Sequence, residues 1–124
     1  GIAMWCKPAK KFYFVRTVKI HKAVYWVENW INENRGEIFF KVEDPRQATF
    51  GRQHDIHKAQ GAGSVKRDAS IWEDYLKDLG DDFVMVRPKK AWTKFSAAKF
   101  KQITGWDEST NEHGRDAGML VFNS

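Results

Sequence analysis

Apolar and polar positions alternate partly over residues 12–20, FYFVRTVKI, which are rich in aromatic and β-branched side chains. Such a run is typical of a β-strand, and Pro8-Ala9-Lys10-Lys11 just before it supplies turn residues. Residues 1–5 are apolar, and we interpret them as the tail of a partner strand that begins upstream of Gly1. The pattern therefore predicts two antiparallel strands that open the domain as a meander.

Apolar residues recur at helical spacing in several later stretches. They predict helices over 22–35, ending near Gly36, and over 64–79, ending at Gly80. Residues 91–103 are basic and helical in character, and a last helix is expected from about Asn111. Residues 46–63 are polar, and we expect them to form a loop or a partly ordered lead into the second helix.

Two short apolar runs lie between the predicted helices, at residues 37–43 and 83–86. Each is followed by a proline, Pro45 or Pro88, and a near-continuous apolar run of this length is typical of a strand covered on both faces. The order is then β-hairpin, α, β, α, β, α. This order predicts a layered α/β domain with a mixed sheet.

Composition excludes several classes of protein. With 124 residues, 42% of them hydrophobic and 30% charged, the chain is expected to be one soluble globular domain with no membrane partner. The net charge of +5 favours a polyanionic partner. Cys6 is the only cysteine, so an intrachain disulfide is excluded and a cytoplasmic location is the expectation.

Three ionisable residues form the candidate catalytic and metal site. Glu43 ends the predicted strand 37–43, and ligand sites in open α/β sheets form beyond the carboxyl ends of strands. His113 and Asp116 are three residues apart at the start of the last helix, so they share one face. Together the three predict a site for a hard cation such as Mg²⁺. The alternatives are a solvated acid at a strand end and a histidine buried in the core.

These residues lie in segments that together resemble a family. The segments FKVED, QGAGSVKRD, FVMVRPKKAW and NEHGRDAGMLV follow one another in the order seen in RNase H-fold nucleases of the RuvC type, the Holliday-junction resolvases and their phage-borne relatives. HGRDA resembles the terminal-helix pattern of that family, and GIAMW resembles the stretch that follows its first-strand Asp. That Asp is expected upstream of Gly1.

The resemblance implies a single RNase H-like domain over residues 1–124, with an antiparallel meander, then parallel strands, and flanking helices. It implies an endonuclease that hydrolyses branched DNA with Mg²⁺, or Mn²⁺ in its place, and that forms a homodimer. Glu43, His113 and Asp116 would be metal ligands, completed by the upstream acid, and His113 could instead relay a proton. Two alternatives stay open: an inactive nucleic-acid-binding module of the same fold, and a nuclease directed at RNA or hybrids.

Basic residues flank the predicted site along the chain. We expect them to contact a phosphate backbone, although an ordinary solvated face has the same composition. They are Arg46, Arg52, Lys58, Lys66, Arg67, Lys89, Lys90 and Lys94. His54 and His57 in the same region are weak candidates for zinc.

The remaining sequence predictions concern tryptophans and one acid. Trp26, Trp30 and Trp72 occupy apolar helical positions and are assigned to the core, which leaves Trp92 and Trp106 as candidates for stacking on bases. Asp44 follows Glu43 and is expected either to point to the opposite face of the strand or to open the turn at Pro45, and it is left outside the site.

Overall fold

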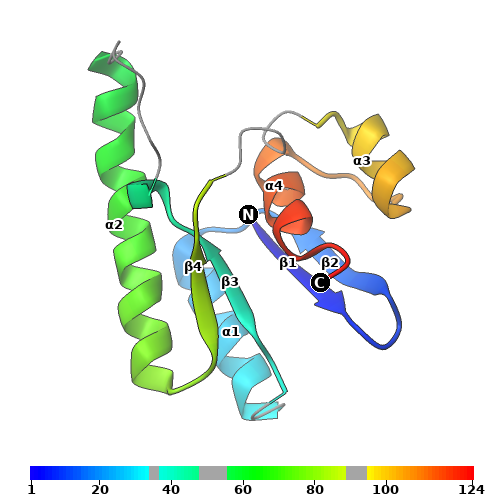
Figure 1. The fold of residues 1–124 in the computed structure, drawn as a ribbon, viewed down its shortest axis with the longest axis horizontal. Helices are drawn as coiled ribbons and strands as arrows, with labels where there is room; N and C mark the ends of the chain where they lie inside the picture. The colour runs from blue at the N-terminus through cyan, green and yellow to red at the C-terminus, as the bar shows by residue number, and fades with distance from the viewer. Residues whose placement is uncertain (34–36, 48–55, 89–94) are drawn as a thin grey trace. The chain divides into compact units, whose positions relative to one another are not determined.

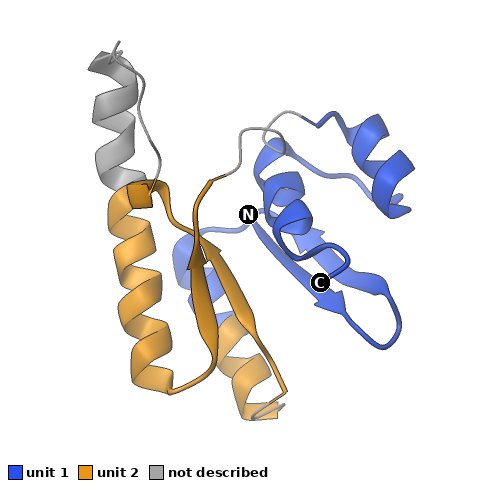
Figure 2. Ribbon diagram, viewed as in Figure 1, with its two compact units in different colours: residues 1–26, 89–124 blue, residues 27–88 orange. Residues whose placement is uncertain are grey.

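The computed structural model describes residues 1–33, 37–47, 56–88 and 95–124, with the backbone alone for residues 56–65 (Figure 1). The described chain divides into two compact units (Figure 2). Unit 1 comprises residues 1–26 and 89–124, and unit 2 comprises residues 27–88. Helix α1 (Ile20–Glu33) starts in unit 1 and ends in unit 2.

Unit 1 is built on an antiparallel hairpin of β1 (Ile2–Cys6) and β2 (Lys11–Arg16). Its turn places Lys10 at a positive φ of 50°, and the Lys10 amide donates to the Lys7 carbonyl at 3.3 Å. The register shifts between Met4 and Trp5, which pair with Phe14 and Phe12. This leaves Tyr13 as the extra residue of a β-bulge, with 58% of its surface exposed.

The core of unit 1 lies between this hairpin and two helices, α3 (Ala97–Thr104) and α4 (Glu112–Val121). Phe12 and Val15 point inward from β2, and Phe100 of α3 packs on Phe12 with ring centroids 6.0 Å apart. Partly buried residues from the hairpin, the loop before α4 and the chain end surround them: Ala3, Trp5, Trp106, Met119, Val121 and Phe122. Helix α4 therefore covers the hairpin through its apolar C-terminal half.

Unit 2 contains a parallel pair, β3 (Phe40–Glu43) and β4 (Phe83–Val86), joined by helix α2 (Ile56–Leu79). Glu43 pairs with Val86, so the carboxyl ends of both strands meet at one edge. The 3₁₀ helix η1 (Pro45–Gln47) follows β3 there and packs on α2. Parallel strands need such a crossover connection, and α2 supplies it.

The structure confirms an α/β protein and most of the predicted elements. The hairpin and the last helix are present, and strand 83–86 has its predicted bounds, but β2 ends at Arg16 rather than at residue 20. The predicted mixed sheet corresponds in the described residues to two separate two-stranded sheets, β1–β2 and β3–β4. Their union in one RNase H-like sheet, and a single domain over residues 1–124, stay predictions.

Some predicted boundaries were wrong. Helix α2 begins at Ile56 rather than at residue 64, within the segment predicted as a loop or a partly ordered lead into the helix, because a long helix propagates through residues of modest propensity once it has nucleated. Strand β3 begins at Phe40 rather than residue 37, and Phe39 and Val84 are 51% and 40% exposed, so the described strands are not covered on both faces.

None of the helices in the described ranges is long and apolar enough to cross a bilayer.

Candidate functional site

The polar start of α4 is a well-capped helix end. Asn111 is the N-cap residue, with an extended backbone, and its side chain accepts a hydrogen bond from the Gly114 amide at 2.9 Å. The Thr17 hydroxyl, just after β2, donates to the same Asn111 oxygen. A helix N-terminus has unpaired amides, and such a cap satisfies one of them. The cap ties the first turn of α4 to the end of the hairpin.

Glycine lets this first turn approach the hairpin closely. A Cβ at Gly114 would lie 3.4 Å from the backbone carbonyl carbon and oxygen of Arg16. A Cβ at Gly1 would lie 1.8 Å from the His113 carbonyl oxygen, so the backbone at the start of β1 runs directly against this turn. Gly114 accounts for part of the low helix propensity of NEHGRDAG, and a Cβ there would be in van der Waals contact with the end of β2.

His113 and Asp116 lie together on α4, as the spacing predicts. His113 is exposed, which excludes the alternative of a buried core histidine, and Asp116 is half-buried. Burial raises the pKa of the Asp116 carboxyl, and repulsion by Glu112 adds to this rise, while the charges of His113 and Arg115 oppose it. The charged form of Asp116 is therefore disfavoured in the folded protein, and a bound cation would stabilise it.

Arg115 has a structural role that the sequence did not indicate. Its Nε donates to the Phe95 carbonyl at 2.7 Å, and its Nη1 donates to the carbonyl and hydroxyl oxygens of Thr110 at 2.9 and 3.1 Å. The planar guanidinium presents five N–H donors in a fixed geometry, so one Arg115 side chain can bind acceptors from two segments at once. Arg115 therefore fixes the segments before α3 and α4 onto the helix that carries His113 and Asp116.

Glu43 lies in unit 2, at the carboxyl end of β3, and is exposed. The neighbouring Asp44 is 3% exposed, and it accepts hydrogen bonds from the Arg46 amide, Nε and Nη2 at 2.7 to 3.0 Å. These hydrogen bonds from Arg46 lower the pKa of the Asp44 carboxyl. The Nη2 of Arg46 also lies 3.2 Å from Oε1 of Glu73 on α2. Asp44 thus belongs to the turn, outside the site, as the sequence predicts.

The three candidate metal ligands are divided between the two units. Glu43 comes from unit 2, and His113 and Asp116 come from unit 1. Within the described parts of the chain, no group of three or more His, Cys, Asp or Glu side chains is placed to hold a metal ion. The three-residue ligand set stays a prediction.

The basic residues predicted to contact phosphate have different surroundings. The Arg46 guanidinium is already bound by Asp44 and Glu73, which accounts for its presence without a phosphate. Lys66 is half-buried and Arg67 is exposed on α2. The side chains of the others, together with His54, His57 and Trp92, lie outside the described residues: Arg52, Lys58, Lys89, Lys90 and Lys94.

The tryptophan predictions need one correction. Trp106 packs against Phe12 with ring centroids 6.1 Å apart, and its Nε1 is buried with no hydrogen-bond partner in the described structure. It belongs to the core of unit 1, because the loop after α3 turns its indole inward, and it is not placed to stack on bases. Trp26, Trp30 and Trp72 are half-buried.

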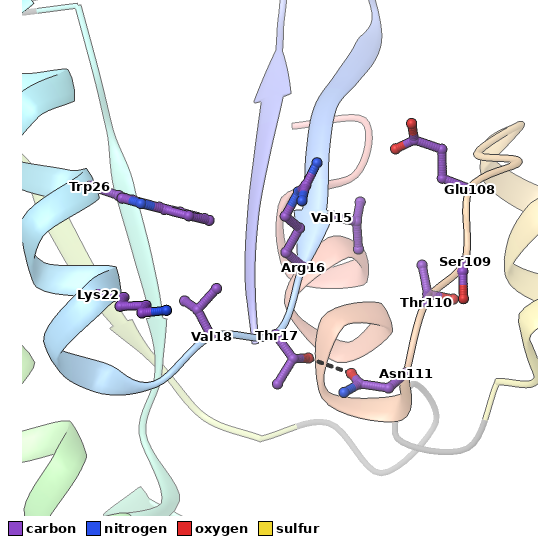
Figure 3. A pocket seen from close by; sticks show the side chains of 10 residues that line it. All are labelled: Val15, Arg16, Thr17, Val18, Lys22, Trp26, Glu108, Ser109, Thr110 and Asn111. Carbon is purple, nitrogen blue, oxygen red and sulfur yellow. Dashed lines mark hydrogen bonds between the residues drawn. The ribbon is translucent and has the colours of Figure 1, made fainter.

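Unit 1 also contains an open cleft of about 830 Å³ that the sequence did not indicate (Figure 3). It lies between the first turns of α1, the end of β2 and the segment before α4. We call it the unit 1 cleft. It is lined by Val15, Arg16, Thr17, Val18, Lys22, Trp26, Glu108, Ser109, Thr110 and Asn111.

Comparisons with protein-family models, with curated proteins and with solved structures found no match.

Proposed function

We propose that the protein is a metal-dependent endonuclease of RNase H-like fold that hydrolyses phosphodiester bonds in branched DNA, as RuvC-type resolvases do. Glu43, His113 and Asp116 would be its ligands for Mg²⁺ or Mn²⁺, together with an Asp encoded upstream of Gly1. Hydrolysis by two metals needs carboxylates that hold the ions about 3.5–4 Å apart, one ion to activate water and one to stabilise the leaving oxygen.

The observation that carries this proposal is the first turn of α4. The helix begins at Glu112, one residue after the predicted start near Asn111, and its first turns carry exposed His113 and half-buried Asp116, whose pKa is raised. The start of β1 runs against the His113 carbonyl. An acid a few residues upstream of Gly1 would therefore be close in sequence to a residue that lies against the backbone of His113.

The parallel strand pair in unit 2 is a second, independent observation that supports the proposal. Glu43 is at the carboxyl end of a strand in a β–α–β connection, where α/β proteins place their ligand sites. Its neighbour Asp44 is buried and held by Arg46, whereas Glu43 is exposed. Of the two adjacent acids, Glu43 is therefore the one that a metal ion can reach from solvent.

Cleavage of a labelled four-way DNA junction tests the proposal. The protein should carry the residues encoded upstream of Gly1, and cleavage should require Mg²⁺ or Mn²⁺. Glu43→Gln and Asp116→Asn should each abolish cleavage but retain junction binding, because each removes charge that holds the metals and also lessens repulsion of phosphate. His113→Ala should reduce the rate about 10²–10⁴-fold if the imidazole transfers a proton.

Glu112→Gln is the matched control. Glu112 is an exposed acid in the same helical turn but is not a proposed ligand, so this variant should keep its cleavage activity. Full activity in both Glu43→Gln and Asp116→Asn would refute the proposed site. Junction binding without cleavage by the unsubstituted protein would favour the inactive binding module, and cleavage of RNA or hybrid substrates alone would favour the third alternative.

A further inference from the structure

The unit 1 cleft combines three chemical features that suit a nucleotide. An aromatic ring, Trp26, extends from α1 into the cleft, and two cations, Arg16 and Lys22, line it (Figure 3). We propose that this cleft binds one nucleotide of a single-stranded DNA segment, with its base stacked on Trp26 and its phosphate held by Arg16 and Lys22. The proposal rests on the proposed function for the class of ligand, and it adds a binding site that is separate from the metal ligands.

The size and openness of the cleft favour a nucleotide within a strand. Its volume of about 830 Å³ is within the range of small-molecule sites, which is about 300–1,000 Å³. It is open to solvent rather than enclosed, which is compatible with a nucleotide that remains linked to its neighbours in a strand. An enclosed cavity would instead favour a free small molecule.

The charges in the cleft favour a phosphate. Arg16 and Lys22 are both exposed and contribute two positive charges, against one negative charge from Glu108. Within the described residues, neither cation takes part in a salt bridge shorter than 4 Å. The guanidinium of Arg16 suits two phosphate oxygens at once.

Trp26 favours an unpaired base over a duplex. Its half-buried indole meets Phe14 edge to face at 6.1 Å, and this contact orients the ring. In a duplex the faces of the bases are covered by their neighbours, whereas in a single strand a base face is free to stack on an aromatic side chain. A branched DNA offers such unpaired bases where its arms separate.

Polar groups opposite Trp26 complete the site. Ser109, Thr110 and Glu108 lie on the segment before α4, across the cleft from α1 (Figure 3). The Ser109 hydroxyl can donate or accept hydrogen bonds, the Thr110 hydroxyl can donate one while it accepts from Arg115, and the Glu108 carboxylate accepts them. They can therefore bind the edge of a base or the sugar without strict selection of one base.

The test compares two fluorescently labelled oligomers of about ten nucleotides, the length scale of a single-strand site. One is a dT oligomer, and the other has the same backbone with abasic tetrahydrofuran units. Binding is measured by anisotropy in EDTA, which prevents metal-dependent cleavage. Trp26→Leu should weaken binding of the dT oligomer about 5- to 150-fold, the value expected for removal of one stacked base, and should leave the abasic oligomer unchanged.

Conservative variants separate stacking from folding. Trp26→Phe keeps an aromatic face and should retain most of the affinity for dT, whereas Tyr25→Leu removes an exposed aromatic residue outside the cleft and should have no effect. Arg16→Gln and Lys22→Gln should weaken both oligomers and lower the slope of log K against log salt by about 0.7 for each phosphate that the variant no longer neutralises. Lys101→Gln, on the exposed face of α3, is the matched charge control.

Three results would overturn the proposal. They are an equal loss of affinity for both oligomers in Trp26→Leu, no loss for either, and competition by free dTMP at the same concentration as the dT oligomer. The last would mean that the cleft takes a free nucleotide. All three results come from binding measured without metal. The nuclease proposal fails on a different result, the lack of metal-dependent cleavage, so the two failures can be distinguished.

Discussion

Two adjacent acids at the end of β3 have opposite environments, and this difference gives a prediction for stability. Asp44→Asn removes the carboxylate that accepts hydrogen bonds from the Arg46 guanidinium, and should lower the free energy of unfolding by about 1.5–3 kcal/mol. Glu43→Gln, at an exposed position, should change it by less than about 0.5 kcal/mol. Urea denaturation followed by circular dichroism measures both. Equal effects would contradict the structural role of Asp44.

The Asp44 pair also gives a pH dependence. Because Arg46 lowers the pKa of Asp44 in the folded protein, its stabilisation is present above the ordinary aspartate pKa of about 3.9 and is lost as the pH falls through the lowered value. The stability difference between the unsubstituted protein and Asp44→Asn should therefore be constant near neutral pH and should shrink in acid. A difference that grew in acid would have the wrong sign.

Asp116 should show the reverse pH dependence. Burial raises its pKa in the folded protein, so its contribution to stability is full below the ordinary aspartate pKa and is lost as the pH rises through the raised value. Asp116→Asn should therefore have a higher Tm than the unsubstituted protein at pH 7, and this gain should disappear below about pH 4. Asp107→Asn, an exposed loop position, is the control and should not change Tm.

At the scale of elements, the packing of α4 on α3 depends on one glycine. A Cβ at Gly118 would lie 2.8 Å from Cζ of Phe100, which is 1% exposed and belongs to the core of unit 1. Gly118→Ala should gain about 1 kcal/mol of helix propensity but lose about 1–3 kcal/mol from overpacking, so we expect a net loss of stability.

Urea denaturation again measures this effect. Gln102→Ala, an exposed position on α3, should change the free energy of unfolding by less than about 0.5 kcal/mol. Adding Phe100→Leu to Gly118→Ala should recover part of the loss caused by the alanine, because the smaller side chain leaves room for the new methyl group. If Gly118→Ala were more stable than the unsubstituted protein, the Phe100 side chain would be able to move aside, and the expected overpacking would be wrong.

Elements with strong local signals were predictable from the sequence. The turn before β2, the strand at 83–86 and a last helix that starts near Asn111 have short-range causes, and each appears close to its expected place. The start of α2 was not predictable, because cooperative extension of a helix masks the weak propensity of its first residues. Trp106 was misassigned because its burial depends on Phe12, which is distant in the sequence.

The candidate site was predictable only in part. The spacing of His113 and Asp116 fixes their common helical face, and the alternation of side chains along a strand separates Glu43 from Asp44. The hydrogen bonds of Arg115 and the lining of the unit 1 cleft join residues up to about a hundred positions apart, such as Thr17 and Asn111. No local pattern in the sequence specifies such contacts.

At the scale of the whole molecule, the nuclease proposal requires acids from two segments far apart in the sequence to share metal ions. Fe²⁺ in the Mg²⁺ position, with ascorbate and hydrogen peroxide, generates hydroxyl radicals that cut the peptide backbone close to the ion. In the protein that carries the upstream residues, we expect cuts near Glu43 and also near residues 113–116. Excess Mg²⁺ should suppress both sets of cuts, because it competes for the same carboxylates.

Substitution of one ligand should then affect the cuts at the other segment. Glu43→Gln should weaken cutting near residues 113–116, since a shared ion loses affinity when any of its carboxylates becomes an amide. Glu112→Gln should leave both sets of cuts in place, because Glu112 is an exposed acid outside the proposed ligand set. Cuts near residues 113–116 that persist unchanged in Glu43→Gln would mean that Asp116 and Glu43 bind no common ion, and the proposed site would be wrong.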